Sequence, residues 1–214
     1  MGINIAGGVT GSKQEVETTS LAARITHRPI DVGALGSYAV SVKSGIMAAG
    51  LSANSPILAF RNAGTAVALI KKVRFIAQGL GTGFTAGATV FDLFAARTFT
   101  VQDTGGGAVT LTTNNAKLRT SYATCSVVIQ ASATATLTAG TRTKDANPIR
   151  TLLSDVPAAA FSVVLADDIF FEAKPGEHPI VLVPNEGFAI EATVPATGTW
   201  TWACGIDWDE VAAY

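Results

Sequence analysis

The chain has 214 residues, of which 48% are hydrophobic and 14% charged, and its formal net charge is -1 at pH 7. That length suits one domain with an appended arm, and high apolar content with little net charge excludes a disordered chain. We expect no membrane partner, because no run approaches the roughly 18 apolar residues of a spanning helix. We expect no nucleic acid either, because 15 basic and 16 acidic residues leave no surplus of Lys and Arg for phosphates.

The low charge fraction predicts self-association. Ordinary globular proteins carry about 25% charged residues, so a solvated monomer of this size should show more charge on its surface. The simplest explanation is that neighbouring chains cover much of the outside. We therefore expect a homo-oligomer, with a trimer favoured.

The first 36 residues form a segment of their own. They contain six glycines and polar clusters, without a sustained apolar period. Two interpretations stay open: a frayed terminus, or an extended arm that packs on a neighbouring subunit. In the second case the scattered apolar residues are the expected self-assembly anchors: Ile3, Ile5, Val9, Val16, Leu21, Ile25 and Ile30. No secretory leader is expected, since the basic and apolar regions of a signal peptide are missing.

From Ser37 to Gln102 the pattern is that of β-strands. Tyr38, Val40 and Val42 alternate with small or polar residues, as in a half-buried strand. Further strands are predicted over residues 56–61, 67–78 and 89–102, although residues 92–97 also suit a short helix.

The middle of the chain contains more turn signals. Residues 103–107 (DTGGG) predict a hairpin between residues 99–101 and 109–111. Residues 125–130 and 134–138 read as strands. The polar stretch 141–157 reads as a long loop, and two short apolar runs, 161–165 and 169–173, flank Asp167 and Asp168.

The last forty residues carry the clearest pattern. A strand over residues 179–183 is followed by a turn at residues 184–187, where Pro184 sets φ and Gly187 supplies a positive φ. A second strand and a second turn, residues 195–198, lead to the final strand. There one face is expected to be buried, and it holds Trp200, Trp202, Cys204, Ile206 and Trp208.

Strands at short spacing, separated by Gly, Pro, Asn and Asp, predict an all-β fold. We expect an antiparallel β-sandwich, jelly-roll-like, over residues 37–214, with an extended N-terminal arm over residues 1–36. Cys125 and Cys204 are expected to be buried free thiols, with a disulfide as the alternative.

The motifs that could carry chemistry are weak. Residues 81–86 fit G-x-G-x-x-A, with Asp103 about 20 positions on, but a dinucleotide site also needs a following helix. The two histidines, His27 and His178, provide no metal-ligand cluster. We therefore predict no cofactor and no metal-ligating residue.

Carboxylate pairs and a basic cluster are the remaining candidates. Asp167 with Asp168, and the group Asp207, Asp209 and Glu210, have the residue type that a glycosidase needs, but such pairs are usually solvated or salt-bridged. Lys71, Lys72 and Arg74 are interpreted as a solvated strand face. We predict no catalytic residue and no enzymatic activity.

Several stretches together resemble a family of tailed-bacteriophage virion proteins. They lie between residues 56 and 210 and leave the N-terminal arm uncovered: LIKKVR at 69–74, GFTAG at 83–87, FDLFAAR at 91–97, KLR at 117–119, AGTRT at 139–143, GEHPI at 176–180, NEGF at 185–188 and PATGTW at 195–200. The order and number of these strings carry the resemblance.

The resemblance implies a particle component, and within the particle we expect a capsid decoration (cement) protein on the phage head. Its implied partners are itself and the major capsid protein. It would be made in the cytoplasm of the bacterial host and end on the capsid surface. Two alternatives stay open: a phage tail or fibre component, and a carbohydrate- or receptor-binding β-sandwich that stacks sugars on Tyr38, Tyr122, Trp200 or Tyr214.

Overall fold

The computed structural model describes residues 35–51, 54–80, 83–157, 164–174, 176–212 and 214, together with two short strands near the N-terminus. The chain divides into two units, Met1–Asp31 and Val32–Tyr214. In the first, β1 (Ala6–Gly7) pairs with β2 (Ser12–Lys13) in antiparallel fashion. The predicted boundary after Gly36 lies inside the second unit, where Gly36 begins β3. The predicted anchors Ile3, Ile5, Val9, Val16, Leu21, Ile25 and Ile30 lie outside the described residues.

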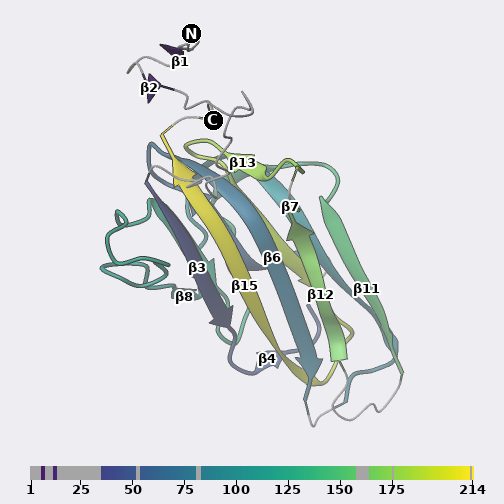
Figure 1. Ribbon diagram of the computed structural model, residues 1–214. Helices are drawn as coiled ribbons and strands as arrows, with labels where there is room; N and C mark the ends of the chain where they lie inside the picture. The colour runs from purple at the N-terminus through teal and green to yellow at the C-terminus, as the bar shows by residue number, and fades with distance from the viewer. Residues whose placement is uncertain are drawn as a thin grey trace. The chain divides into compact units, whose positions relative to one another are not determined.

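The second unit is built from two antiparallel sheets (Figure 1), and its described residues contain no helix. The six-stranded sheet has the order β12 (Val164–Glu172), β6 (Val67–Gly79), β15 (Thr199–Val211), β3 (Gly36–Lys43), with β13 (Ile180–Leu182) beside β6 and β4 (Met47–Ala48) beside β15. The seven-stranded sheet has the order β10 (Thr141–Lys144), β7 (Gly87–Val101), β14 (Gly187–Thr193), β5 (Ser55–Asn62), β9 (Val127–Ala131), β8 (Gly107–Ala108), with β11 (Arg150–Val156) also beside β7. Among the described residues, no helix is long and apolar enough to cross a membrane.

The long strands follow a jelly-roll path. In chain order they are β3, β5, β6, β7, β11, β12, β14 and β15. The first, eighth, third and sixth form one sheet, and the second, seventh, fourth and fifth form the other. This winding pairs the last strand with the first, β15 with β3, and gives the double-sheet architecture of two Greek keys. The predicted jelly-roll-like β-sandwich is confirmed.

The core lies between the sheets and is rich in aromatic rings. The predicted buried face of β15 is confirmed, since Trp200, Trp202, Cys204, Ile206 and Trp208 are all buried. Phe75 of β6 packs on Trp202 with ring centroids 6.0 Å apart, and Phe60 of β5 meets Trp208 edge-on at 5.5 Å. These rings come from both sheets, so their burial fixes how the two layers face each other.

The strand predicted over residues 89–102 is confirmed as β7, and the alternative of a short helix at residues 92–97 is wrong. These residues form the middle of the long strand, where Leu93 to Ala96 are all buried. With both faces covered, the alternation that marks a strand disappears. The predicted hairpin from 99–101 to 109–111 does not form either, because the end of β7 pairs with Thr141 of β10 and β8 pairs with β9.

Three further expectations about the middle of the chain need correction. The predicted loop at 141–157 contains β10 and β11, both of which pair with β7. The predicted strand at 134–138 is reduced to one bridge between Thr138 and Thr104. Of the two short runs, Val164 with Leu165 and residues 169–172 belong to one strand, β12; residues 158–163 lie outside the described part.

The turn before β14 has its expected position but a different residue in the left-handed region. Asn185 adopts φ 63°, whereas Gly187 does not have a positive φ. Gly187 lies where β14 approaches β5 closely, and any Cβ at this position would collide with the carbonyl of Phe60. Glycine is therefore needed there for space, and Asn tolerates the left-handed conformation.

Candidate functional site

The glycine-rich stretch 81–86 leads into a strand. Gly81 and Thr82 lie outside the described residues, but Phe84 is buried in the core and β7 begins at Gly87. A dinucleotide site needs a helix whose N-terminus faces the pyrophosphate. Asp103, the expected ribose ligand, is instead buried in an ion pair with Arg142. This stretch is therefore an inter-strand connection.

The two neighbouring carboxylates of β12, Asp167 and Asp168, each pair with a different arginine. Asp167 accepts a hydrogen bond from Arg74 at 3.0 Å, and Asp168 accepts one from Arg150 at 3.0 Å. Neighbouring residues of a strand point to opposite sides, so the two carboxylates do not face a common substrate. They hold the edge of one sheet to β6 and to β11 of the other.

Of the three carboxylates at the end of β15, Asp209 and Glu210 are buried structural groups, whereas Asp207 is half-buried on the outer face. Lys71 is an extra residue in β6, at a bulge opposite Asp207 and Trp208, and its Nζ lies 2.7 Å from Oδ1 of the fully buried Asp209. Glu210 accepts a hydrogen bond from the Ser126 backbone N–H at 2.8 Å. Burial raises the pKa of Glu210 above its ordinary value.

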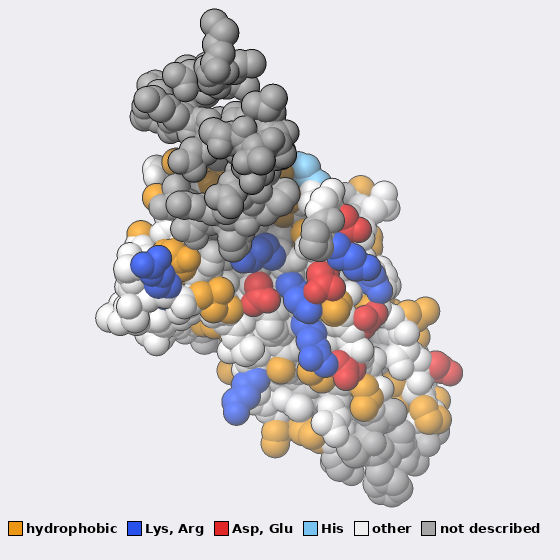
Figure 2. Space-filling model, in the orientation of Figure 1, with side chains coloured by type: hydrophobic (Ala, Val, Ile, Leu, Met, Phe, Trp, Pro, Cys, Tyr) orange, Lys and Arg blue, Asp and Glu red, His pale blue; other side chains and the backbone are white. Residues whose placement is uncertain are grey.

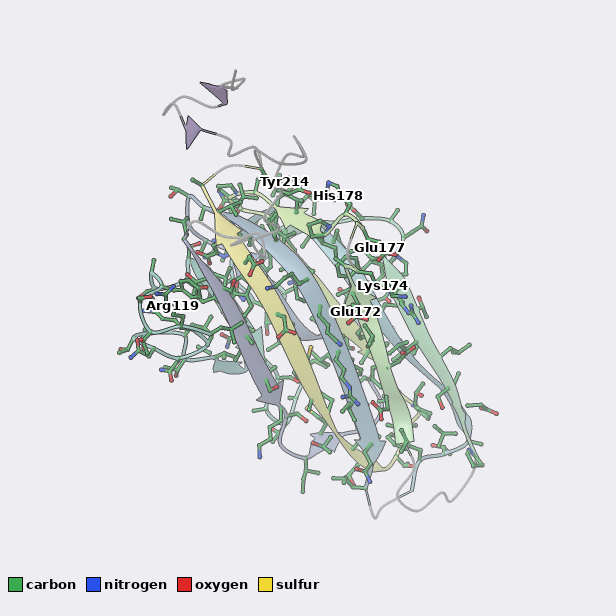
Figure 3. All side chains as sticks on the ribbon, in the orientation of Figure 1. Arg119, Glu172, Lys174, Glu177, His178 and Tyr214 are labelled. Carbon is green, nitrogen blue, oxygen red and sulfur yellow. The ribbon has the colours of Figure 1, made fainter. Side chains whose placement is uncertain are left out.

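His178 lies in a loop beside the C-terminal residue (Figure 3). Its ring faces that of Tyr214 edge-on, with centroids 5.3 Å apart, and its Nδ1 is 2.7 Å from the Pro179 carbonyl. The nearby Glu177 accepts a hydrogen bond from the Lys174 backbone N–H. Within the described residues no three His, Cys, Asp or Glu side chains are grouped as metal ligands; His27 lies outside them.

Both cysteines are free thiols. Cys204 is fully buried and Cys125 is half-buried, so the expectation of two buried thiols holds fully only for Cys204. Burial raises the pKa of Cys125 to about 11, and it also raises the pKa of Cys204. Since the thiolate is the reactive form, neither side chain has the character of a nucleophile.

The outer face of the six-stranded sheet carries most of the charge seen in Figure 2. Blue and red side chains lie next to each other over β6 and β12. Lys72 pairs with Glu172 at 2.9 Å, and Arg74 pairs with Asp167. Each cation of the predicted basic cluster thus has a carboxylate beside it, which agrees with a solvated strand face.

Beside these ion pairs lies a strip of small side chains. It crosses from β15 to β3 on the same outer face and consists of Ala203, Gly205, Ala39 and Ser41. A shallow groove of about 390 Å³ borders it, lined in part by Lys71, Glu172, Asp207 and Leu118. The face is therefore flat in its middle and charged along one side.

The outer face of the seven-stranded sheet holds a buried ion network that the sequence did not predict. Arg142 of β10 pairs with Asp103 and lies 3.8 Å from Glu191 of β14, whose other oxygen is 2.5 Å from Lys144 Nζ. The Asp103, Arg142 and Glu191 side chains are at most 5% exposed. Two cations and two anions balance, so the network fastens the β10 segment onto the sheet.

The aromatic residues expected to stack sugars are mostly in the core. Tyr38 and Trp200 are fully buried. Tyr122 is half-buried and packs against Tyr38 with ring centroids 6.5 Å apart. Only Tyr214 is exposed, and one ring is a poor platform for a carbohydrate. The geometry therefore disfavours the sugar-binding alternative.

Comparisons with known proteins found no matching family model, no matching curated protein and no matching solved structure.

Proposed function

We propose that this protein is a non-enzymatic structural component of a tailed-bacteriophage virion, a decoration protein that binds the major capsid protein on the surface of the head. The observation that carries the proposal is the division of the chain into a sandwich with its own core, Val32–Tyr214, and a separate N-terminal unit, Met1–Asp31. Two separate units on one chain can supply two linked binding elements, which suits a protein that clamps neighbouring subunits of a shell.

The physical basis of such a clamp is multivalency. When two contacts are linked, the second forms at a high effective concentration, so weak contacts repeated on a symmetric lattice give tight binding. The arm supplies one contact and the body the other. Ordering the arm costs roughly 1–2 kcal/mol per residue in backbone entropy, so its apolar residues must be buried on the neighbour.

The body also suits a mechanical role. Its core contains all three Trp and is closed by pairing between the first and last long strands. On the outside, the ion pairs of β6 and β12 are already satisfied within the chain, and the neighbouring strip of small residues offers a flat area for packing. Jelly rolls occur in viral capsid domains and in lectin domains, so the fold supports the proposal by analogy.

The test is immunogold labelling of virions of the phage that encodes the chain, viewed by negative-stain microscopy. The proposal expects gold particles over the head. Label confined to the tail or fibres would overturn the decoration role in favour of a tail component. Label absent from intact and from mildly disrupted virions would overturn the virion assignment itself.

A further inference from the structure

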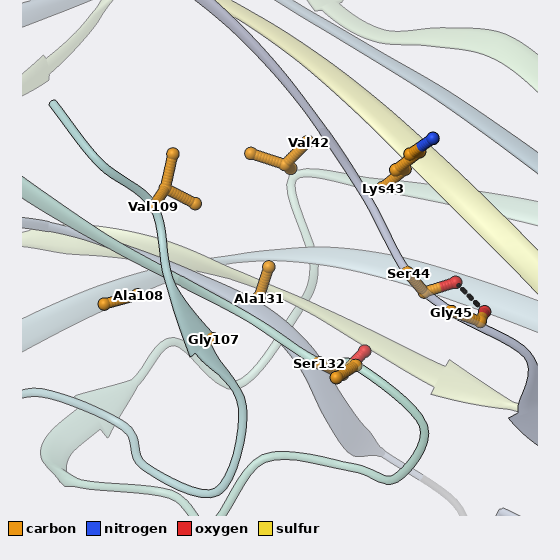
Figure 4. Close-up of a pocket in the computed structure, with 10 residues that line it drawn as sticks. Val42, Lys43, Ser44, Gly45, Gly107, Ala108, Val109, Ala131 and Ser132 are labelled. Carbon is orange, nitrogen blue, oxygen red and sulfur yellow. Dashed lines mark hydrogen bonds between the residues drawn. The ribbon is translucent and has the colours of Figure 1, made fainter. Parts of the chain in front are cut away.

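On the side of β3, the seven-stranded sheet extends further than the six-stranded sheet. Beyond β5 the seven-stranded sheet continues with β9 and β8, whereas the other sheet stops at β3. Part of the overhang is covered by the segment around Ala116 and Leu118, which bonds to the beginning of β3. Next to it a groove of about 490 Å³ stays open between the end of β3 and β8 (Figure 4).

The groove leads to the interior layer of the sandwich. Val42 and Ala131 on its walls belong to the core, and Val109 packs against that core. Gly107 pairs with Ala131, so a side chain there would point to the same inner side. A Cβ built on Gly107 has no atom within 4 Å, and Gly107 has no positive φ. The core layer therefore lacks apolar side chains at this place.

The backbone of β3 is also unpaired along the groove. Ser44 donates to the Trp202 carbonyl of β15, and Ala39 donates in the opposite direction to Ala116. Because these directions alternate along a strand, the N–H and C=O groups of Ser41 and Lys43 point away from β15. Among the described residues they have no hydrogen-bond partner. This is a short open edge of the kind that accepts an added strand.

We propose that the groove binds residues 3–5 of a second copy of this chain as an added strand on β3. The sequence Ile3-Asn4-Ile5 places two β-branched apolar side chains on one side of a strand and a polar one on the other. The isoleucines enter the apolar groove, and Asn4 faces solvent. The added strand covers the overhang and bonds to Ser41 and Lys43.

The length of the N-terminal segment allows this contact between copies. Since β1 pairs back on β2, the reach comes from the 22 residues at positions 14–35, between Lys13 and Gly36. At up to about 3.3 Å per residue, these are enough to reach another subunit. The inference deepens the proposed assembly role by naming the self-contact. Its readout is association in solution, so it can fail or succeed independently of binding to a capsid.

The test uses three variants of the full chain. Ile3→Asp removes an anchor from the arm, and Gly107→Leu fills the groove without strain. Ser41→Pro removes the backbone N–H that points away from β15 into the open edge, and edge strands tolerate proline at such a position. Ser41→Ala, which keeps that N–H, is its matched control. Sedimentation velocity over a concentration series measures association, and circular dichroism confirms that each variant is folded.

We expect wild type and Ser41→Ala to associate alike. Ile3→Asp, Gly107→Leu and Ser41→Pro should each raise the protein concentration at which half of the chains are associated by about tenfold or more. The decisive sample is an equimolar mixture of Ile3→Asp and Gly107→Leu. One partner still has an intact arm and the other an intact groove, so the mixture should restore a complex limited to two chains. A monomeric wild type, variants that associate like wild type, or a mixture that stays monomeric would each overturn the proposal; the last two outcomes would indicate another interface or an arm bound to its own chain.

Discussion

Trp202→Ala should be among the most destabilising single substitutions in the sandwich. The indole is 2% exposed, packs on Phe75 with centroids 6.0 Å apart, and donates from Nε1 to Ser132 Oγ at 3.0 Å. Truncating a buried Trp to Ala costs about 3–5 kcal/mol. The lost hydrogen bond contributes a further 0.5–1.5 kcal/mol or so, which places the expected cost in the upper half of the range.

The control is the neighbouring Thr201→Ala on the opposite face of β15. Thr201 is half-buried, and its hydroxyl lies 3.2 Å from Ser44 Oγ, so the expected loss is below about 1 kcal/mol. Urea denaturation measures both variants. With an m-value of about 2 kcal/mol/M, Trp202→Ala should lower the midpoint by about 2 M. If Thr201→Ala destabilised the protein more than Trp202→Ala, the assignment of faces on β15 would be refuted.

Three further predictions follow from buried polar groups. Arg142→Met leaves Asp103 and Glu191 without their shared cation and should lower the free energy of unfolding by about 3–5 kcal/mol, partly recovered in the double variant with Asp103→Asn; a cost under about 1 kcal/mol in urea would contradict the network. The raised pKa of Glu210 means that folding favours the protonated carboxyl. The protonated carboxyl therefore stabilises the fold below the pKa of the unfolded chain, about 4.3, and this contribution is lost as pH rises through the pKa of the folded protein. Glu210→Gln should therefore gain stability relative to wild type from pH 4.5 to 7.5, and a relative loss in urea titrations would count against this. Cys204 should not react with a thiol reagent at pH 8 until denaturant is added, because its thiol is buried and its pKa is raised; rapid reaction of two thiols per native chain would show that the core is open.

The strands that could be predicted are those with one covered face. In β15 the alternation of Trp, Cys and Ile with small polar residues determines both the strand and its orientation, because side chains of a strand alternate between faces. β3 and the second half of β6 follow the same logic, whereas β5, with Ile57 to Phe60 all buried, was predicted from a short apolar run. Their order in the sheets was not predictable from local pattern, since pairing of β15 with β3 joins opposite ends of the chain.

Errors arose where distant segments decide the environment. Residues 141–157 read as a loop because they are polar, yet Arg142 is buried by contacts with Asp103 and Glu191, which lie 39 and 49 positions away by residue number. Glu191 occupies a position of β14 that alternation assigns to solvent, and it is buried because the β10 segment covers that face. Turn signals at residues 103–107 mark a reversal but do not determine which strand becomes the partner.

The groove beside β3 was hidden from sequence reasoning for a similar reason. Val42, Gly107 and Ala131 lie on three separate strands, and only the unequal width of the two sheets leaves them open. The predicted arm anchors stay a prediction.

The measurement that tests the central claim most directly is co-sedimentation with capsids that lack this protein. Full-length chain and a variant without residues 1–31 are compared at equal concentration, with thermal unfolding of both as the control for folding. We predict that the truncated protein keeps its thermal stability but binds far more weakly, because one of two linked contacts is lost. Full-strength binding by the truncated protein, or no binding by the intact chain, would contradict it.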